Sequence, residues 1–274
     1  MFVAHERTVS AAYAHGLNTH ADIPRHDRHY LLGPPKRNTV LELWEVERYG
    51  RDSFGDPDYV SIYGLRPREW YARGVRLLAR TAVECTRDRL AELIGRDVSE
   101  LVRSANPSRA VVIDAFAGSA NTLYWLSRVV ETRQAIGFEL DDAVFETTRR
   151  NLAILGLDVT LSHQPYETAL PRTRVSADEL PIVFIAPPWG DALDPSDGLD
   201  LRRTTPPVAD VIEQVRAAFP GRPAIAAVQV YEKVEAGSLG EVESLCEWTR
   251  RTTYDIDAPG RNHGVLVGTI GWRP

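Results

Sequence analysis

The feature that most constrains the fold is an alternation of apolar runs and amphipathic segments that begins after Ser108. Apolar, strand-like runs occupy residues 110–116, 135–140, 159–163, 181–186 and 224–230. Segments with helical spacing of apolar residues lie between them, at 122–130, 142–156 and 207–219. This alternation predicts an α/β fold, a mostly parallel sheet with helices on both faces. Two further runs, 251–257 and 264–272, are expected to close one sheet edge and bring the sheet to seven strands.

The residues before this alternation have a different character. Residues 1–40 are rich in His, Arg, Pro and Gly and show little periodicity, which indicates an arm. Residues 41–50 are expected to form a short helix, and the Gly and Pro of residues 54–67 predict a loop. Apolar residues then recur at helical spacing over 68–95, which predicts one long helix or two.

Length and composition limit the possible organisation and partners. The 274 residues, 43% of them hydrophobic, suffice for an arm (1–40), a helical extension (41–107) and a large α/β domain (108–274). The net charge of −6 makes long nucleic acid a less favoured partner, because phosphate contacts carry much of that affinity. Two cysteines without metal-ligand spacing fit a reducing compartment, and we expect no metal site. Since no membrane span or signal peptide is evident, we expect a cytoplasmic protein without a membrane partner.

The segment DAFAGSANT, residues 114–122, ends the first strand of the alternation with an acid and continues with small residues. Ligands of open α/β sheets bind beyond the carboxyl ends of the strands. Gly118, Ser119 and Ala120 would let the backbone approach such a ligand closely, and the N–H groups of the following helix would point at it. Asn121, at the start of that helix, is expected to cap it or to contact the ligand.

Glu139 ends the second strand, 21 residues after Gly118. An acid at this position can accept hydrogen bonds from both hydroxyls of a ribose. The run G-S-A-N-T-L lacks the second glycine that admits a pyrophosphate, and Asp114 would repel a phosphate while attracting a cation. A ligand with a ribose, an amino group and no phosphate is S-adenosyl-L-methionine, which is therefore the expected cofactor. A tight turn with Glu139 merely at the surface is the alternative.

The segment PIVFIAPPWGD, residues 181–191, is a strand that ends in two prolines and a tryptophan. Because proline has no N–H, carbonyl groups here stay free to accept hydrogen bonds. Trp189 offers a flat face on which a planar group can stack. The combination suits a planar amine whose nitrogen faces a sulfonium methyl group, although a rigid turn with a buried tryptophan would have the same sequence.

The two segments together resemble the class I S-adenosylmethionine-dependent methyltransferases, over roughly residues 108–230. The trimethylguanosine synthase family, with its D-A-F-C-G-type and S-P-P-W-G-type motifs, is the most similar in pattern, and F-A-G-S also resembles DNA amino-methyltransferases and ribosomal RNA guanine methyltransferases. The resemblance implies a Rossmann-like seven-stranded sheet and an N-terminal helical extension that completes the pocket. Three departures are a shorter first loop with Ala120 for its second glycine, Ala186 at the start of the fourth motif, and Gln164 in place of an acid. The second departure counts against DNA methylation.

The resemblance also implies roles for individual residues. Asp114 would help to hold the methionine amino group, Glu139 would bind the ribose, and Gln164 would meet the adenine amine. The full set of expected cofactor contacts is Asp114, Phe116, Ala117, Gly118, Asn121, Glu139, Leu140 and Gln164. The expected acceptor platform and catalytic set is Ala186, Pro187, Trp189 and Asp191, with Asp191 either a general base or a solvated loop acid.

The expected function is N-methylation of a planar small molecule or nucleotide stacked on Trp189. An RNA methyltransferase and a relative that binds the cofactor without transferring a methyl group are the alternatives. The polar segment 191–207 is interpreted as an active-site loop in which Arg202 and Arg203 would meet an anionic group. A simple solvated loop is the alternative. His163 is expected to be structural rather than catalytic.

Overall fold

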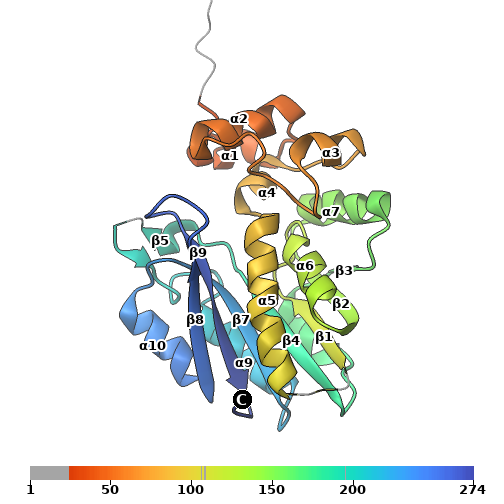
Figure 1. Ribbon diagram of the computed structural model, residues 1–274, viewed down its shortest axis with the longest axis vertical. Coiled ribbons are helices and arrows are strands. Elements are labelled where there is room, and N and C mark those ends of the chain that lie inside the picture. The colour runs from red at the N-terminus through yellow and green to blue at the C-terminus, as the bar shows by residue number, and fades with distance from the viewer. Residues whose placement is uncertain (1–24, 106, 108, 195) are drawn as a thin grey trace, which may run out of the picture.

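Seven strands form one sheet in the order β3-β2-β1-β4-β7-β9-β8 in the computed structural model, which describes residues 25–105, 107, 109–194 and 196–274 (Figure 1). The strands are β1 (Arg109–Asp114), β2 (Thr132–Glu139), β3 (Thr160–His163), β4 (Glu179–Ile185), β7 (Ala224–Tyr231), β8 (Trp248–Tyr254) and β9 (His263–Ile270). The first five strands of this order pair in parallel, whereas β9 is antiparallel to both β7 and β8. The expected α/β fold is confirmed, with the last strand inserted beside β7 rather than at the edge.

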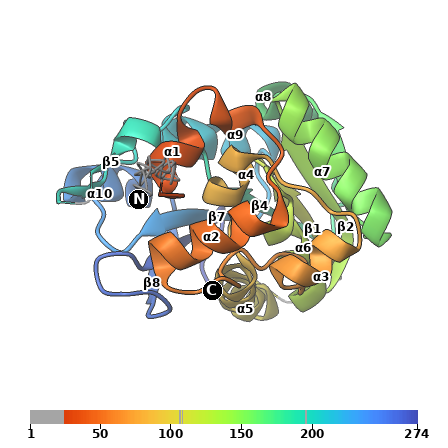
Figure 2. The ribbon, with the colours of Figure 1, turned by 90° about the horizontal axis from the view of Figure 1, so that it is seen from above.

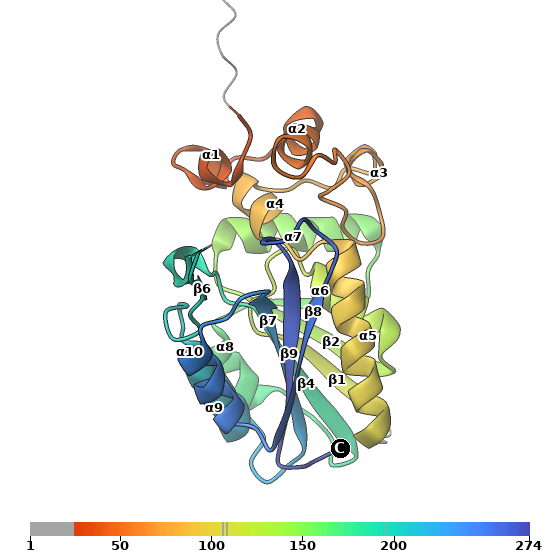
Figure 3. The same cartoon turned by 60° about the vertical axis from the view of Figure 1, so that its left-hand side comes forward.

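Helices cover both faces of the sheet (Figure 3). One face carries α5 (Asp88–Ala105), α6 (Asn121–Val129) and α7 (Asp142–Leu155), and the other carries α8 (Tyr166–Ala169), α9 (Val208–Ala218) and α10 (Ala236–Ser244). Successive residues of a strand point to opposite faces, so Ala110 and Val112 of β1 pack in one apolar cluster and Val111 and Ile113 in the other. The sheet is therefore buried on both sides, as its apolar strands require.

Helix α5 packs closely against α6, and a glycine makes this approach possible. A Cβ atom at Gly95 would lie 2.6 Å from Cγ2 of Val129, closer than packed carbon atoms come. The contact lies at the carboxyl end of α6, whose last residue is Val129, and it holds this helix against α5. The position of α6 relative to the rest of the chain is thus fixed before any ligand is considered.

The N-terminal segment folds over the carboxyl ends of the strands (Figures 1 and 2). We call residues 25–87 the cap; it contains α1 (Arg28–Leu32), η1 (Lys36–Asn38), α2 (Leu43–Phe54), α3 (Pro67–Ala72) and α4 (Ala79–Glu84). The predicted arm is therefore folded from residue 25 to residue 40, while residues 1–24 lie outside the described residues.

The prediction of one or two helices over residues 68–95 is wrong, because this range contains α3, α4 and the first part of α5. Gly74 has a φ of +93°, which ends α3, and Leu78 forms an isolated antiparallel bridge with Val40. The apolar residues of this range keep their helical spacing, but tertiary pairing interrupts the helix. The division into arm, extension and domain stays a prediction, since one apolar cluster includes both Trp70 of the cap and Leu123 of α6.

Two buried asparagines fasten the cap to the α/β part. Asn121, at the start of α6, accepts a hydrogen bond from the N–H of Tyr63 (2.6 Å) and donates one to the carbonyl of Thr86 (2.8 Å). Asn151 of α7 accepts from the N–H of Arg76 (3.0 Å) and donates to its carbonyl (2.7 Å). Each amide thus satisfies an N–H and a carbonyl of the cap that would otherwise be buried without a partner.

We expect Asn121→Ala to lower the free energy of unfolding by about 2–4 kcal/mol, because it leaves one backbone N–H and one carbonyl buried without partners. Urea unfolding followed by circular dichroism measures this loss. Asn38→Ala, a substitution of an exposed asparagine in the cap, is the control and should change stability by less than about 0.5 kcal/mol. Equal stabilities of the two variants would contradict the role assigned to Asn121.

Candidate active site

A cavity of about 1600 Å³ lies between the cap and the carboxyl ends of the strands. Its size exceeds that of most small-ligand pockets and is sufficient for two ligands side by side. Eleven of the twelve expected site residues line it: Asp114, Phe116, Ala117, Gly118, Glu139, Leu140, Gln164, Ala186, Pro187, Trp189 and Asp191. The loops after β1, β2, β3 and β4 therefore meet in one space.

Hydrogen bonds hold the loop after β1 in an open turn. Gly118 has a φ of +51° and Ala120 a φ of +58°, so both adopt the left-handed conformation. The N–H of Gly118 donates to Oε2 of Glu139 (2.9 Å), and its carbonyl accepts from the hydroxyl of Thr148 (2.7 Å). Ala120 thus takes the backbone conformation that glycine favours.

Glu139 joins the first two loops. Its Oε2 accepts from Gly118 and its Oε1 from the N–H of Asp141 (2.8 Å). Each carboxylate oxygen can accept a further hydrogen bond. Glu139 is half-buried and lines the cavity, so these remaining positions are accessible to hydroxyl groups of a ligand.

Asp114 is a carboxylate at the floor of the cavity, only 2% exposed. Burial raises its pKa to about 7; the N–H of Phe116, 3.0 Å from Oδ1, acts in the opposite direction, and the charge of Glu139 adds to the rise. A buried carboxylate in this state gains from a nearby positive charge, which would stabilise its ionised form. The floor of the cavity therefore favours a cationic group.

Asn121 is the expected site residue that does not line the cavity. Both ends of its amide bind the cap, it is 1% exposed, and it does not line the cavity. Nor does it cap α6, because Ala120 occupies the N-cap position. A polar residue at a helix start suggests capping by sequence alone, but here backbone groups 58 and 35 residues earlier take its hydrogen bonds.

The segment after β4 forms one wall of the cavity. Trp189 is half-buried, and its ring lies 6.3 Å from that of Tyr231 and 5.3 Å from that of His263. Ala186 and Pro187 lie at the base of this wall, while Asp191 is exposed in the short 3₁₀ helix η3 (Gly190–Ala192). The indole is accordingly neither sealed in the core nor fully solvated.

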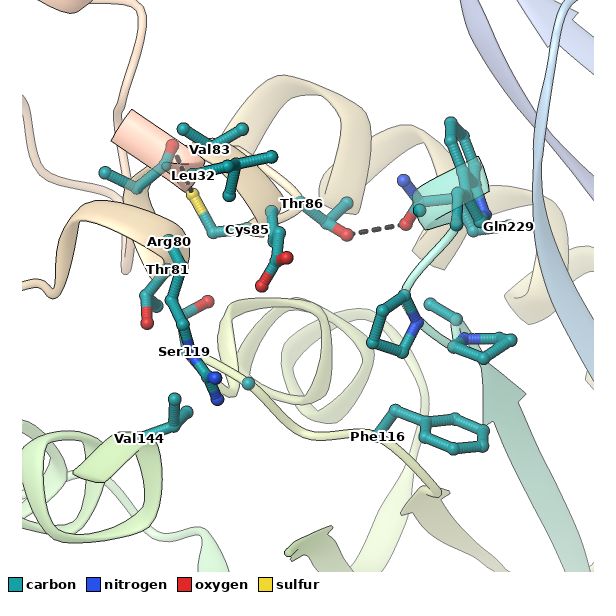
Figure 4. Close-up of a pocket in the computed structure, with 18 of the residues that line it drawn as sticks. Leu32, Arg80, Thr81, Val83, Cys85, Thr86, Phe116, Ser119, Val144 and Gln229 are labelled. Carbon is teal, nitrogen blue, oxygen red and sulfur yellow. Dashed lines mark hydrogen bonds between the residues drawn. The ribbon is translucent and has the colours of Figure 1, made fainter. Parts of the chain in front are cut away.

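The cap contributes residues that sequence reasoning missed. Arg80 extends from α4 across the cavity toward Ser119 and Val144, and it pairs with Asp141 at 3.0 Å (Figure 4). Its Nε is buried and has no hydrogen-bond partner among the described residues. Glu84 also lines the cavity; burial raises its pKa, and Arg80, Arg37 and Arg28 act against the rise. No motif marks these residues, because their positions depend on how the cap docks.

The structure also places the two arginines of segment 191–207, the segment itself and His163. Arg202 is paired with Asp200 (2.9 Å) and Glu235 (2.8 Å), and neither it nor Arg203 lines the cavity. Their contact with an anionic group stays a prediction. Part of segment 191–207 is folded as the two-stranded ribbon of β5 (Leu193–Asp194) and β6 (Gly198–Leu199). His163 stacks on the ring of Phe145 and contacts the carbonyl of Leu140, which agrees with a structural role.

The described ranges contain neither a metal-binding cluster nor a membrane-spanning helix. No group of three or more His, Cys, Asp or Glu residues there is arranged to hold a metal ion. No helix of the same residues is long and apolar enough to cross a lipid bilayer.

Comparison with known proteins agrees with this architecture. A family model described as "Conserved hypothetical protein 95" matches residues 96–203, and no curated protein matches. The N-terminal domain of human METTL16 in complex with SAH is similar in structure, with a TM-score of 0.50 and 14% identity over 69% of this chain and 73% of that one. A precorrin-6y C5,15-methyltransferase from Geobacter metallireducens has a TM-score of 0.47 and 11% identity over 70% and 91%. The chain has the Rossmann-like fold of the class I methyltransferases.

We expect Asp114→Asn to remove a pH dependence of stability. The folded pKa of about 7 lies above the usual value of about 3.9, so the wild type is favoured at low pH and loses stability as the pH rises from about 4 to about 7. Relative to the wild type, the variant should gain roughly 1–3 kcal/mol between pH 5 and pH 8 in urea unfolding. Asp158→Asn, at an exposed site, is the control; an identical pH dependence in the wild type and Asp114→Asn would refute this assignment.

Proposed function

We propose that the protein transfers a methyl group from S-adenosyl-L-methionine to a nitrogen atom of a planar small molecule or nucleotide stacked on Trp189. The observation that carries the proposal is that one cavity joins Gly118 and Glu139 to Trp189. The class I methyltransferase fold and the fold similarity to the SAH-bound METTL16 domain support the class of enzyme and the cofactor. The motif pair D-A-F-A-G and A-P-P-W-G supports a trimethylguanosine synthase-like acceptor of guanine type.

The residues of the cavity fit this cofactor. Its amino and sulfonium groups are cationic, and Asp114 offers a buried carboxylate that gains from positive charge. Its ribose hydroxyls suit the remaining acceptor positions of Glu139, and its carboxylate suits the buried Nε of Arg80, which has no hydrogen-bond partner among the described residues. Phe116, Ala117, Gly118, Leu140 and Gln164 line the adjoining surface.

When bound, the cofactor supplies an electrophilic methyl group on sulfur. The residues of this chain then have two tasks, orientation and exclusion of water. Trp189 supports one face of the acceptor, and the carbonyls of Ala186 and Pro187 accept hydrogen bonds from its N–H groups, which directs the nitrogen lone pair. The cap covers the site and lowers its exposure to solvent. Asp191, at the mouth, is the candidate to take up the released proton.

The experiment that tests the proposal combines calorimetric titration of the cofactor with a survey of acceptors. Release of S-adenosylhomocysteine is measured with purine and pyrimidine nucleosides, their monophosphates and planar heteroaromatic amines. Turnover of a free heterocycle or nucleotide supports the proposal. Turnover of RNA alone would support the RNA methyltransferase, and binding without turnover of any substrate would support a relative that does not methylate.

We expect Glu139→Ala to weaken S-adenosylmethionine binding by about 1–3 kcal/mol, because charge-assisted hydrogen bonds are lost. Calorimetric titration measures the change. Glu139→Gln, which keeps one acceptor oxygen and can still hold one of the two backbone N–H groups, should lose less. Glu146→Ala, on the exposed face of α7, is the matched control, and an affinity of Glu139→Ala equal to that of the control would remove Glu139 from the site.

Trp189→Ala should reduce turnover at least tenfold while leaving cofactor affinity within about twofold, because the indole serves the acceptor and not the cofactor. Trp189→Phe should retain part of the activity, since it keeps a smaller ring. Trp44→Ala is the control, because Trp44 is 53% exposed and does not line the cavity. Full activity of Trp189→Ala would count against the stacking platform.

A further inference from the structure

Three aromatic rings form the wall of the cavity on the side of β7 and β9. Trp189 follows β4, Tyr231 ends β7 and His263 begins β9, and Tyr231 pairs with His263 across the two antiparallel strands. The ring of His263 lies 5.3 Å from that of Trp189 and 5.9 Å from that of Tyr231. Because β4, β7 and β9 are neighbours in the sheet, the three side chains are held on one rigid edge. A molecule stacked on Trp189 therefore lies next to His263.

The imidazole of His263 has polar atoms that the protein does not use. His263 is half-buried and lines the cavity, and neither of its ring nitrogens is hydrogen-bonded within the part of the chain that the structure describes. The phenol of Tyr231, in contrast, donates to the carbonyl of Gly260. Because His263 lines the cavity, a ligand bound there can supply a hydrogen-bond partner for this imidazole.

The surroundings of His263 keep the imidazole uncharged. Burial lowers its pKa to about 4; Arg87 and Arg28 lower it further, while Asp257 and Glu232 act against this. The packed rings of Trp189 and Tyr231 bring no charge of their own at neutral pH. One ring nitrogen is then a hydrogen-bond acceptor and the other a donor. An uncharged acceptor also adds no positive charge beside a sulfonium ion.

We propose that His263 binds the methyl acceptor, with one ring nitrogen accepting a hydrogen bond from an N–H group on the edge of the stacked heterocycle. This inference rests on the proposed function and narrows its substrate class to planar heterocycles that carry an N–H beside their stacked face. A site built to pair with an N–H discriminates against an isostere that lacks it, because its own polar atom is then left unpaired. His263 thus contributes to acceptor specificity, whereas Trp189 contributes to affinity for planar molecules in general.

Gln229 supports this assignment from the adjacent position. It lies on β7 and lines the cavity, and its Oε1 accepts a hydrogen bond from the hydroxyl of Thr86 in the cap (2.6 Å; Figure 4). Because this bond occupies the oxygen, the amide presents N–H donors on its other side. The wall thus combines an acceptor at His263 with donors at Gln229, a pattern that matches a heterocycle edge with one N–H and one acceptor atom.

The test uses two planar probes that differ in a single group: benzimidazole, which has an N–H, and benzoxazole, in which oxygen replaces it. Dissociation constants are measured by NMR at pH 8 with saturating S-adenosylhomocysteine. The wild type should bind benzimidazole about threefold to tenfold more tightly than benzoxazole, the range expected for one uncharged hydrogen bond. His263→Phe should lose this preference and still bind benzoxazole, while His263→Gln, which keeps an acceptor, should retain part of it.

Two controls separate this inference from the proposed function. His163→Phe makes the same change outside the cavity and should keep the preference of the wild type. Trp189→Ala should weaken both probes equally. Probe binding that depends on Trp189 with an unchanged preference in His263→Phe would overturn the inference and leave the proposed function intact. Failure of both probes to bind the wild type would overturn both.

Discussion

The site depends on the fixed position of the cap, and two buried asparagines help to fix that position together with a shared apolar cluster. Asn121 and Asn151 extend from the helices that follow β1 and β2, and each binds main-chain atoms of the cap rather than side chains. Hydrogen bonds to backbone atoms fix where the cap segments lie, whatever side chains those segments carry. Helices α6 and α7, which begin after the loops that follow β1 and β2, thus also hold the cap above those loops.

Charged groups of both signs line the cavity. The cap contributes the guanidinium groups of Arg28, Arg37 and Arg80 together with the carboxyl group of Glu84, and the strand ends contribute the carboxylates of Asp114 and Glu139. In the proposed complex, the amino group of the methionine moiety would face Asp114 and its carboxylate would face Arg80. Burial raises the pKa of Asp114, so keeping this carboxylate ionised in the cavity costs free energy of folding. The protein without its cofactor is therefore less stable at neutral pH than the same fold would be with an amide at that position.

The sequence predicts that the ends of the parallel strands meet in one cavity, because the signals for strand ends are local. Asp114, Gly118 and Glu139 lie at ends of strands that apolar runs reveal, and parallel strands end at a common edge. The sequence predictions that are wrong are those that depend on contacts between residues far apart in the chain. Asn121 has the sequence signature of a helix cap, yet Tyr63 and Thr86 take its hydrogen bonds. The breaks between α3, α4 and α5 are likewise set by tertiary pairing, which helical spacing cannot reveal.

The aromatic wall of Trp189, Tyr231 and His263, which the proposed function assigns to the methyl acceptor, is built from residues far apart in the sequence. Trp189 has a recognisable motif around it, but His263 lies 74 residues later and reaches the indole only because β9 runs antiparallel between β7 and β8. Gln229 gains its orientation from Thr86, 143 residues earlier. The aromatic wall and the loops after β1 and β2 come from different elements. In the proposed function, a substitution at His263 or Gln229 would therefore change which heterocycle is accepted without disturbing those loops, so the acceptor must be tested at these two residues.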